Sequence, residues 1–296
     1  NIDIITYCNS NILDSSISGV IGCRTDALIK LVENNLVEAY QQEHSAYNQL
    51  LEVFSVREDN TNWLIPLVVK LSNDMRFLAE MADDRIGGDY KNLRECLNSL
   101  TRGFTIVAKD RTPITQEHSK KHALFAVSNV LFKVYFKLNT LQLCGKLINV
   151  VEGPGGIMDN IKLFPVSDVV MYKYYIGRLK MFEDKYEEAR ECLRFAYKYT
   201  PKNCIQNRRK ILASLAPIEM CLGVIPNKEI SDVYGLHEMY VLGQAIKYGD
   251  IKSFEQIIST NQRTFIKLGV YLVLEQAKSI AYRSLYKRIC LIIGNT

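Results

Sequence analysis

The segment "YIGRLKMFEDKYEEARECLRFAYKYTPKN", from Tyr175 to Asn203, decides how the chain is expected to fold. Its helical spacing on both sides of the polar stretch "FEDKY" predicts two helices joined by a tight turn. Pro201 is expected to end the second helix, because proline cannot continue the hydrogen-bond ladder. A single hairpin cannot bury its apolar face, so neighbouring hairpins are expected to stack on it.

The same segment resembles one unit of a tetratricopeptide-like repeat. Such a unit needs small residues where its helices cross and a proline after the second helix. The positions that match are Gly177, Tyr186, Ala189, Ala196 and Pro201. Lys173 and Ile176 stand where an aromatic residue and a leucine are expected. The match therefore predicts a hairpin more firmly than a regular array.

A second hairpin is predicted in "LHEMYVLGQAIKYGDIKSFEQIIST", from Leu236 to Thr260. Gly249 suits the left-handed position that follows a helix, where glycine carries no steric penalty. Asp250 suits the N-cap of the next helix, since its carboxylate can accept from free backbone N–H groups. That helix is expected to bury Ile251, Phe254 and Ile258.

Helical spacing also dominates the rest of the 296 residues, and alternating strand patterns are hard to find. We therefore expect an all-α protein. A break is predicted at Asn34–Asn35 and a hairpin turn near Leu138–Asn139. Another helix is expected to run from a cap at Asn60–Asn62 to Gly87–Gly88, with Pro66 in its first turns or at a kink.

The clearest helix breaker is "EGPGG", residues Glu152–Gly156. It predicts an N-terminal helical-repeat region over residues 1–165 and a second helical region over residues 166–296. Residues 1–150 carry 16 basic and 17 acidic side chains, whereas residues 151–296 carry 21 and 15. The excess of positive charge in the second region suits nucleic acid or an acidic partner, or it faces solvent alone.

Three basic clusters follow from this charge. Arg190, Arg194 and Lys198 form a ridge that Glu187 and Glu191 are expected to pair with in solvent. Two further sets are candidates for nucleic-acid or acidic-partner binding, namely Arg208, Arg209 and Lys210, and Arg283, Lys287 and Arg288. The alternatives are a solvated turn for the first set and a covered helix end for the second. Nearby aromatic residues, including Tyr172, Tyr199, Tyr282 and Tyr286, are expected in the core rather than stacked on bases.

Catalytic and cofactor motifs are not found in the sequence. The eight cysteines are scattered and never form C-x-x-C, which favours free, buried thiols in a reducing compartment. His118 and His122 share a helical face, but no third ligand lies nearby, so an ordinary helix start is expected. No phosphate-binding, zinc-protease or nucleophile-elbow pattern occurs. We expect no enzyme activity, no cofactor and no metal, and no apolar run approaches the ~20 residues of a membrane span.

Several segments together resemble the PCI-domain-containing protein 2 family. The three that carry the resemblance are "SKKHALFAVSNVLFKVYFKLNTLQLCGKLI", "YKYYIGRLKMFEDKYEEARECLRFAY" and "FIKLGVYLVLEQAKSIAYRSLYKRICLII". The resemblance extends from about Asn34 to Ile293. It implies a right-handed superhelical stack of hairpins that forms the helical part of a PCI domain. A winged helix should follow, and the chain stops at "LIIGNT", about where it would begin.

The resemblance also implies a non-enzymatic scaffold function. Similar proteins belong to the transcription and export complex 2, which couples transcription to mRNA export at nuclear pores. The implied partners are a larger PCI scaffold of the germinal-centre-associated nuclear protein type, a small acidic disordered subunit shared with the proteasome lid, and RNA or single-stranded DNA. The implied location is the nucleus, with the cytoplasm as a second one. The alternatives are a PCI subunit associated with the COP9 signalosome and a stand-alone module for single-stranded nucleic acid.

Overall fold

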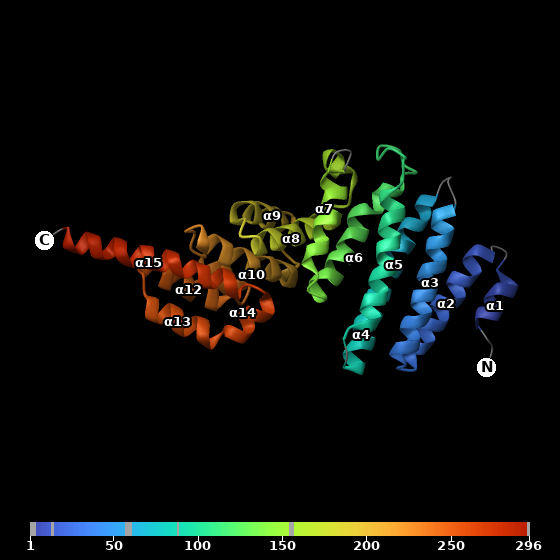
Figure 1. The fold of residues 1–296 in the computed structure, drawn as a ribbon, viewed down its shortest axis with the longest axis horizontal. Helices are drawn as coiled ribbons and strands as arrows, with labels where there is room; N and C mark the ends of the chain where they lie inside the picture. The colour runs from blue at the N-terminus through green and yellow to red at the C-terminus, as the bar shows by residue number, and fades with distance from the viewer. Residues whose placement is uncertain (1–3, 13–14, 57–60, 88, 154–156, 295–296) are drawn as a thin grey trace. The chain divides into compact units, whose positions relative to one another are not determined.

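The computed structural model describes residues 4–12, 15–56, 61–87, 89–153 and 157–294 (Figure 1). Across these residues all regular structure is α-helix or short 3-10 helix, without a strand. The all-α prediction is confirmed. The chain forms two compact units, Asn1–Asp168 and Val169–Thr296. The superhelical stack with its handedness, and the assignment of the second unit to a PCI domain, stay predictions.

Among the described residues of the first unit, the α-helices are α1 (Ile4–Asn11), α2 (Ser15–Val32), α3 (Leu36–Val56), α4 (Ile65–Ile86), α5 (Lys91–Ala108), α6 (Leu124–Lys137) and α7 (Cys144–Glu152). The 3-10 turns between them are η1 (Thr61–Leu64), η2 (Lys120–Ala123) and η3 (Leu141–Leu143), and η4 (Met158–Leu163) follows α7. Each helix from α2 to α6 packs on the next, as Figure 1 shows. The predicted break and turn are confirmed at Asn34 and Asn139, whose φ angles are 61° and 54°.

The start of α4 differs from the prediction. The helix follows η1 directly, and its N-cap residue Leu64 makes no side-chain hydrogen bond. The expected cap at Asn60–Asn62 is therefore wrong for Asn62, while Asn60 lies outside the described residues, as do Gly88 and residues 154–156 of the predicted breaker. Pro66 lies in the first turn of α4, and Gly87 ends the helix in the left-handed conformation.

A buried ion cluster joins the first three long helices of this unit. The guanidinium of Arg24 on α2 lies 2.5 Å from the carboxylate of Glu43 on α3 and 2.6 Å from that of Asp74 on α4. The Glu43 side chain has no exposed surface. Burial raises the pKa of Glu43, and the hydrogen bond from Arg24 opposes that rise. Arg24 is therefore the counterion that allows a charged carboxylate in this core.

The α-helices described in the second unit are α8 (Val166–Phe182), which begins just before the first residue of the unit, α9 (Tyr186–Tyr199), α10 (Ile205–Cys221), α11 (Lys228–Val233), α12 (His237–Tyr248), α13 (Ile251–Thr260), α14 (Gln262–Leu268) and α15 (Tyr271–Ile293). Helix α15 packs on α10, α12, α13 and α14 around one apolar core. This arrangement leaves the carboxy-terminal part of α15 largely exposed.

The hairpin predicted from the opening segment is formed by α8 and α9. At the helix crossing, a Cβ on Gly177 would lie 2.7 Å from Leu193 Cγ, so glycine is needed there. Ala189 and Ala196 are fully buried on the facing side of α9. The Tyr186 hydroxyl donates to Asp184 at 2.8 Å and also bonds Gln276 on α15, which ties the turn to the long helix.

The second predicted hairpin is formed by α12 and α13. Gly249 ends α12 at φ 66°, and the Asp250 carboxylate accepts from the Ser253 N–H at 3.0 Å. Phe254 and Ile258 are buried as expected, whereas Ile251 is only partly buried. The turn meets the backbone of Leu285 on α15, since a Cβ on Gly249 would lie 2.5 Å from the Leu285 nitrogen.

Candidate nucleic-acid and partner interface

The exposed part of α15 carries three of the predicted basic residues. Arg283 and Lys287 are exposed, and neither forms an ion pair with another described residue. Arg288 instead donates from Nη1 to the carbonyl oxygen of Tyr248 at 2.7 Å. Arg288 is thus held at the end of α12, while the other two side chains extend into solvent.

Exposed tyrosine rings lie on the same two helices as these cations, and one ring contacts Arg288. Tyr248 is 52% exposed, and its ring lies 5.5 Å from Lys247 Nζ and 5.9 Å from the Arg288 guanidinium. On α15, Tyr282 and Tyr286 are 39% and 64% exposed. We define the tyrosine–cation surface as Lys247, Tyr248, Tyr282, Arg283, Tyr286, Lys287 and Arg288. Exposed rings beside cations provide stacking for bases and charge for phosphates, which are the two requirements for binding single strands.

The structure corrects part of the aromatic prediction. Tyr172 is buried in the core as expected, but Tyr199, Tyr282 and Tyr286 are exposed. Helical spacing did not distinguish the exposed tyrosines from the buried one. Tyr282 and Tyr286 are exposed because α15 extends beyond the helices it packs on. Sequence reasoning also missed Tyr248. The sequence gives little indication of its role, since Tyr248 is a lone aromatic residue directly before a helix-ending glycine. Only the packing of α12 on α15 brings it to Arg288.

Arg208 is the candidate that the structure places differently. It is 8% exposed, and its guanidinium lies 4.0 Å from the centroid of the Tyr197 ring. Its Nη1 donates to the carbonyl oxygen of Thr200 at 2.9 Å. Arg208 therefore bonds the end of α9 to α10 and does not face solvent. The expectation that it contacts a phosphate or an acidic partner is wrong for this conformation.

Replacing Arg208 with methionine is expected to destabilise the second unit by about 2–3 kcal/mol, because it removes a charge-assisted hydrogen bond and a buried cation–π contact. Hydrogen exchange of the α9–α10 amides measures this loss. The matched control is Arg209→Met, since Arg209 is exposed and makes one 3.3 Å bond to the Gly235 carbonyl. A loss no larger than that of the control would contradict a structural role for Arg208.

The remaining basic candidates lie at the surface. Lys210 is exposed on α10. On α9, Arg190 pairs with Glu187 as expected. Arg194 instead binds Glu219 on α10 at 2.7 Å, so its expected pairing with Glu191 is wrong. The ridge of α9 is thus partly neutralised, whereas Arg283 and Lys287 on α15 form no ion pair with another described residue.

One group of residues resembles a nucleophile–base–acid set. Ser99 Oγ lies 2.7 Å from His44 Nε2, and His44 Nδ1 lies 4.0 Å from a Glu95 carboxylate oxygen. Burial lowers the pKa of His44. Ser99 lies within α5, where the N–H groups bond to the preceding turn and cannot form an oxyanion site. We interpret the group as a polar contact between α3 and α5.

Other chemistry is limited in the described part of the chain. No group of three or more potential metal ligands occurs among those residues. Ser119 accepts from the Lys121 N–H, which begins the helical turn that contains His122. Cys290 is exposed, so the expectation that every thiol is buried is wrong there. Of the helices that the structure describes, none has the length and apolar character to cross a membrane.

Two units of packed helices, the second of which ends in an exposed, charged helix, define an all-α protein, and comparison with known proteins identifies the family. The chain is 33% identical over 301 residues to a PCI domain-containing protein 2 homolog of Dictyostelium discoideum, covering 98% of this chain and 68% of the relative. It is 30% identical over 262 residues to PCI domain-containing protein 2 of Danio rerio, covering 86% and 64%. The chain belongs to the PCI domain-containing protein 2 family.

The relatives also differ in name and length. A Neurospora crassa protein named Protein CSN12 homolog is 29% identical over 251 residues, covering 77% of this chain and 55% of the relative. No protein-family model matches the chain. The chain spans about two thirds of the length of the first curated relatives it matches.

Proposed function

We propose that this chain is a non-enzymatic scaffold subunit of a nuclear mRNA-export complex that couples transcription to export at nuclear pores. It pairs there with a larger PCI scaffold of the germinal-centre-associated nuclear protein type and with a small acidic disordered subunit. Its own contribution is part of a platform for RNA. Membership of the PCI domain-containing protein 2 family supports the scaffold function.

The observation that carries the RNA function is the tyrosine–cation surface. Arg283 and Lys287 are exposed and unpaired within the described residues, so a phosphate can replace water around them without breaking an ion pair. Tyr286 lies between them in sequence and is 64% exposed. Stacking on such rings contributes about 1–3 kcal/mol per base and is tolerant of sequence. The surface therefore favours single strands without a fixed sequence.

Fluorescence anisotropy of a single-stranded RNA, titrated with the chain at several salt concentrations, tests this function. The double variant Arg283→Glu/Lys287→Glu is expected to bind at least tenfold more weakly. The slope of log affinity against log salt concentration should become shallower by about 1.4, because each lost phosphate contact contributes roughly 0.7. The matched control is Arg102→Glu/Lys146→Glu, which reverses two exposed charges in the first unit. Equal affinity of the two double variants would remove α15 from the RNA site.

The same titration, repeated with the scaffold partner and the acidic subunit present, separates two forms of the proposal. Tight binding by the chain alone makes the tyrosine–cation surface an RNA site in itself. Binding that occurs only in the assembly makes the chain a brace for a platform shared between subunits. Failure of the chain to join the scaffold partner at all would contradict the proposed function.

A second candidate is a subunit associated with the COP9 signalosome, which the name of the Neurospora relative favours. Affinity purification of the tagged protein from its own cells, followed by mass spectrometry, distinguishes the two assemblies. Export-complex subunits at stoichiometric amounts support the first proposal. Signalosome subunits at stoichiometric amounts would replace it with the second. RNA recovered with neither set of subunits would favour the stand-alone nucleic-acid module.

A further inference from the structure

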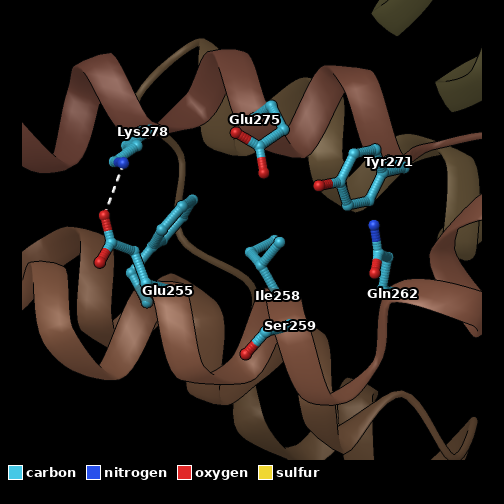
Figure 2. A pocket seen from close by; sticks show the side chains of 8 residues that line it. Glu255, Ile258, Ser259, Gln262, Tyr271, Glu275 and Lys278 are labelled. Atoms are coloured by element: carbon cyan, nitrogen blue, oxygen red, sulfur yellow. Dashed lines mark hydrogen bonds and ion pairs between the residues drawn. The ribbon is translucent and has the colours of Figure 1, made fainter.

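A hollow of about 290 Å³ opens between α13, α14 and α15, on a part of the second unit that the RNA proposal does not use (Figure 2). Eight residues line it, namely Phe254, Glu255, Ile258, Ser259, Gln262, Tyr271, Glu275 and Lys278. Its volume is at the lower limit for small-molecule sites, which are usually 300–1,000 Å³. The size therefore suits a single side chain better than a cofactor.

The hollow has an apolar floor and an acidic rim. Phe254 and Ile258 belong to the core and form its apolar part. Lys278 binds Glu255 at 2.6 Å, so these two charges neutralise each other. Figure 2 shows Glu275 and Tyr271 on α15 facing Ile258 and Gln262 across the opening.

Glu275 keeps an unneutralised negative charge. Its carboxylate interacts with the Tyr271 hydroxyl and thereby raises the pKa of Tyr271. Among the described residues no cation forms an ion pair with Glu275. It is also the only acidic residue after position 259, where six basic residues occur. A carboxylate of this kind beside an apolar floor is complementary to a side chain with a long aliphatic stem and a cationic end.

The hollow continues into an exposed stripe on α15. Tyr271, Glu275, Lys278, Tyr282, Tyr286 and Ile289 follow one another at intervals of three or four residues, so they share one side of the helix. The stripe is polar at the hollow and apolar or aromatic beyond it, and Ile289 is exposed. A partner helix lying along this stripe would place one of its side chains at the hollow. The hollow itself lies outside the tyrosine–cation surface, but the stripe shares Tyr282 and Tyr286 with it, so the partner helix and RNA would compete for these two rings.

We propose that the hollow receives an arginine side chain from a helix of a protein partner that lies along this stripe. The guanidinium pairs with Glu275, and the aliphatic stem covers Phe254 and Ile258. Arginine is favoured over lysine because its planar fork pairs with a carboxylate through two hydrogen bonds and stacks on a ring such as Tyr271. The inference rests on the proposed scaffold function, since it supplies a contact by which a partner is held.

Two-dimensional NMR of the whole chain, titrated with N-acetyl-arginine amide, tests the hollow directly. We expect shifts confined to Ser259, Gln262 and Tyr271, with a dissociation constant of ~1–10 mM, as for a weak fragment. N-acetyl-citrulline amide has the same shape without the charge and should bind at least fivefold more weakly. Equal shifts from the two ligands, or no shifts near the hollow, would overturn the proposal.

Glu275→Gln should weaken arginine-amide binding at least fivefold while leaving the fold unchanged, because Glu275 is exposed. The matched control is Glu229→Gln, an exposed glutamate at the start of α11. Selection of a displayed library of helical peptides on the chain, with counter-selection on Glu275→Gln, tests the stripe. Enrichment of an arginine spaced at helical intervals from apolar residues supports the proposal, and its absence opposes it.

The failure of this inference can be told apart from failure of the RNA platform. Glu275→Gln should leave RNA anisotropy unchanged or slightly stronger, since it removes a negative charge. Loss of arginine binding with intact RNA binding is therefore specific to the hollow. An unchanged RNA affinity in Arg283→Glu/Lys287→Glu, together with intact arginine binding, would overturn the RNA platform and leave the hollow in place.

Discussion

Replacement of Gly249 by alanine is expected to destabilise the second unit by about 2–5 kcal/mol. Two costs contribute. An alanine at φ 66° takes a left-handed conformation that costs about 1–2 kcal/mol in an L-residue. The new Cβ would also lie 2.5 Å from the Leu285 nitrogen and 2.6 Å from its Cα. Backbone atoms cannot rotate away, so α12 and α15 must separate, and such overpacking typically costs 1–3 kcal/mol.

The matched control for this substitution is Gly235→Ala. Gly235 has a similar φ of 61°, but a Cβ there would meet no atom within 4 Å. The control therefore isolates the conformational cost, and the difference between the two variants measures the collision with Leu285. Hydrogen exchange of the α12 and α15 amides is the measurement. Equal protection in both variants would show that the two helices do not depend on their close approach.

The same substitution should affect the tyrosine–cation surface. Gly249 follows Tyr248, whose carbonyl oxygen accepts from Arg288. If α12 and α15 separate at Leu285, that hydrogen bond and the ring contact are lost together. RNA affinity of Gly249→Ala is then expected to fall even at temperatures where the unit stays folded. Unchanged RNA affinity would mean that Tyr248 contributes nothing to the site.

Replacement of Arg24 by methionine is expected to destabilise the first unit by about 3–5 kcal/mol, because it leaves the fully buried Glu43 carboxylate without its counterion. The single tryptophan, Trp63, belongs to this unit. Urea unfolding followed by tryptophan fluorescence therefore reports on the first unit alone. Lys30→Met is the matched control on α2, since among the described residues Lys30 pairs with the exposed Glu33 and Glu38, and its loss should destabilise the unit far less.

The loss of stability of the first unit in Arg24→Met should become smaller as pH falls. Burial raises the pKa of Glu43 in the folded state, and removal of Arg24 takes away the interaction that opposes this rise. A carboxyl with a raised folded pKa is stabilising below its unfolded pKa and loses that contribution as pH rises. The variant should therefore recover stability relative to the native chain as pH falls toward 4.5. A deficit that does not change with pH would exclude Glu43 as its cause.

Much of the helical architecture could be predicted because its signals are local. The turn after α2 shows as Asn34–Asn35, and the α12–α13 turn shows as Gly249 and Asp250, since asparagine and glycine tolerate positive φ and aspartate caps a helix. The cap at Asn62 was wrong because a 3-10 turn supplied the start of α4 instead. Local sequence does not decide between these two ways of beginning a helix.

The interaction sites could not be predicted from the sequence, because they depend on contacts between segments that are far apart in the chain. Arg208 and Arg209 are neighbours in sequence, yet one is buried against Tyr197 and the other is exposed, because the end of α9 covers only one side of α10. Tyr248 and Arg288 are 40 residues apart and meet only through helix packing. Spacing within one helix carries no information about which of its faces another helix will cover.

The sequence by itself determined the all-α class, the positions of most turns and the family, since helical periodicity and turn residues act over a few positions and homology is read from the chain directly. Only the tertiary structure decided which cations remain free, which tyrosines are exposed, and that Glu275 faces a hollow. The physical reason is that burial and pairing are properties of two surfaces in contact. The side chains of one helix acquire them only when a second helix packs on it.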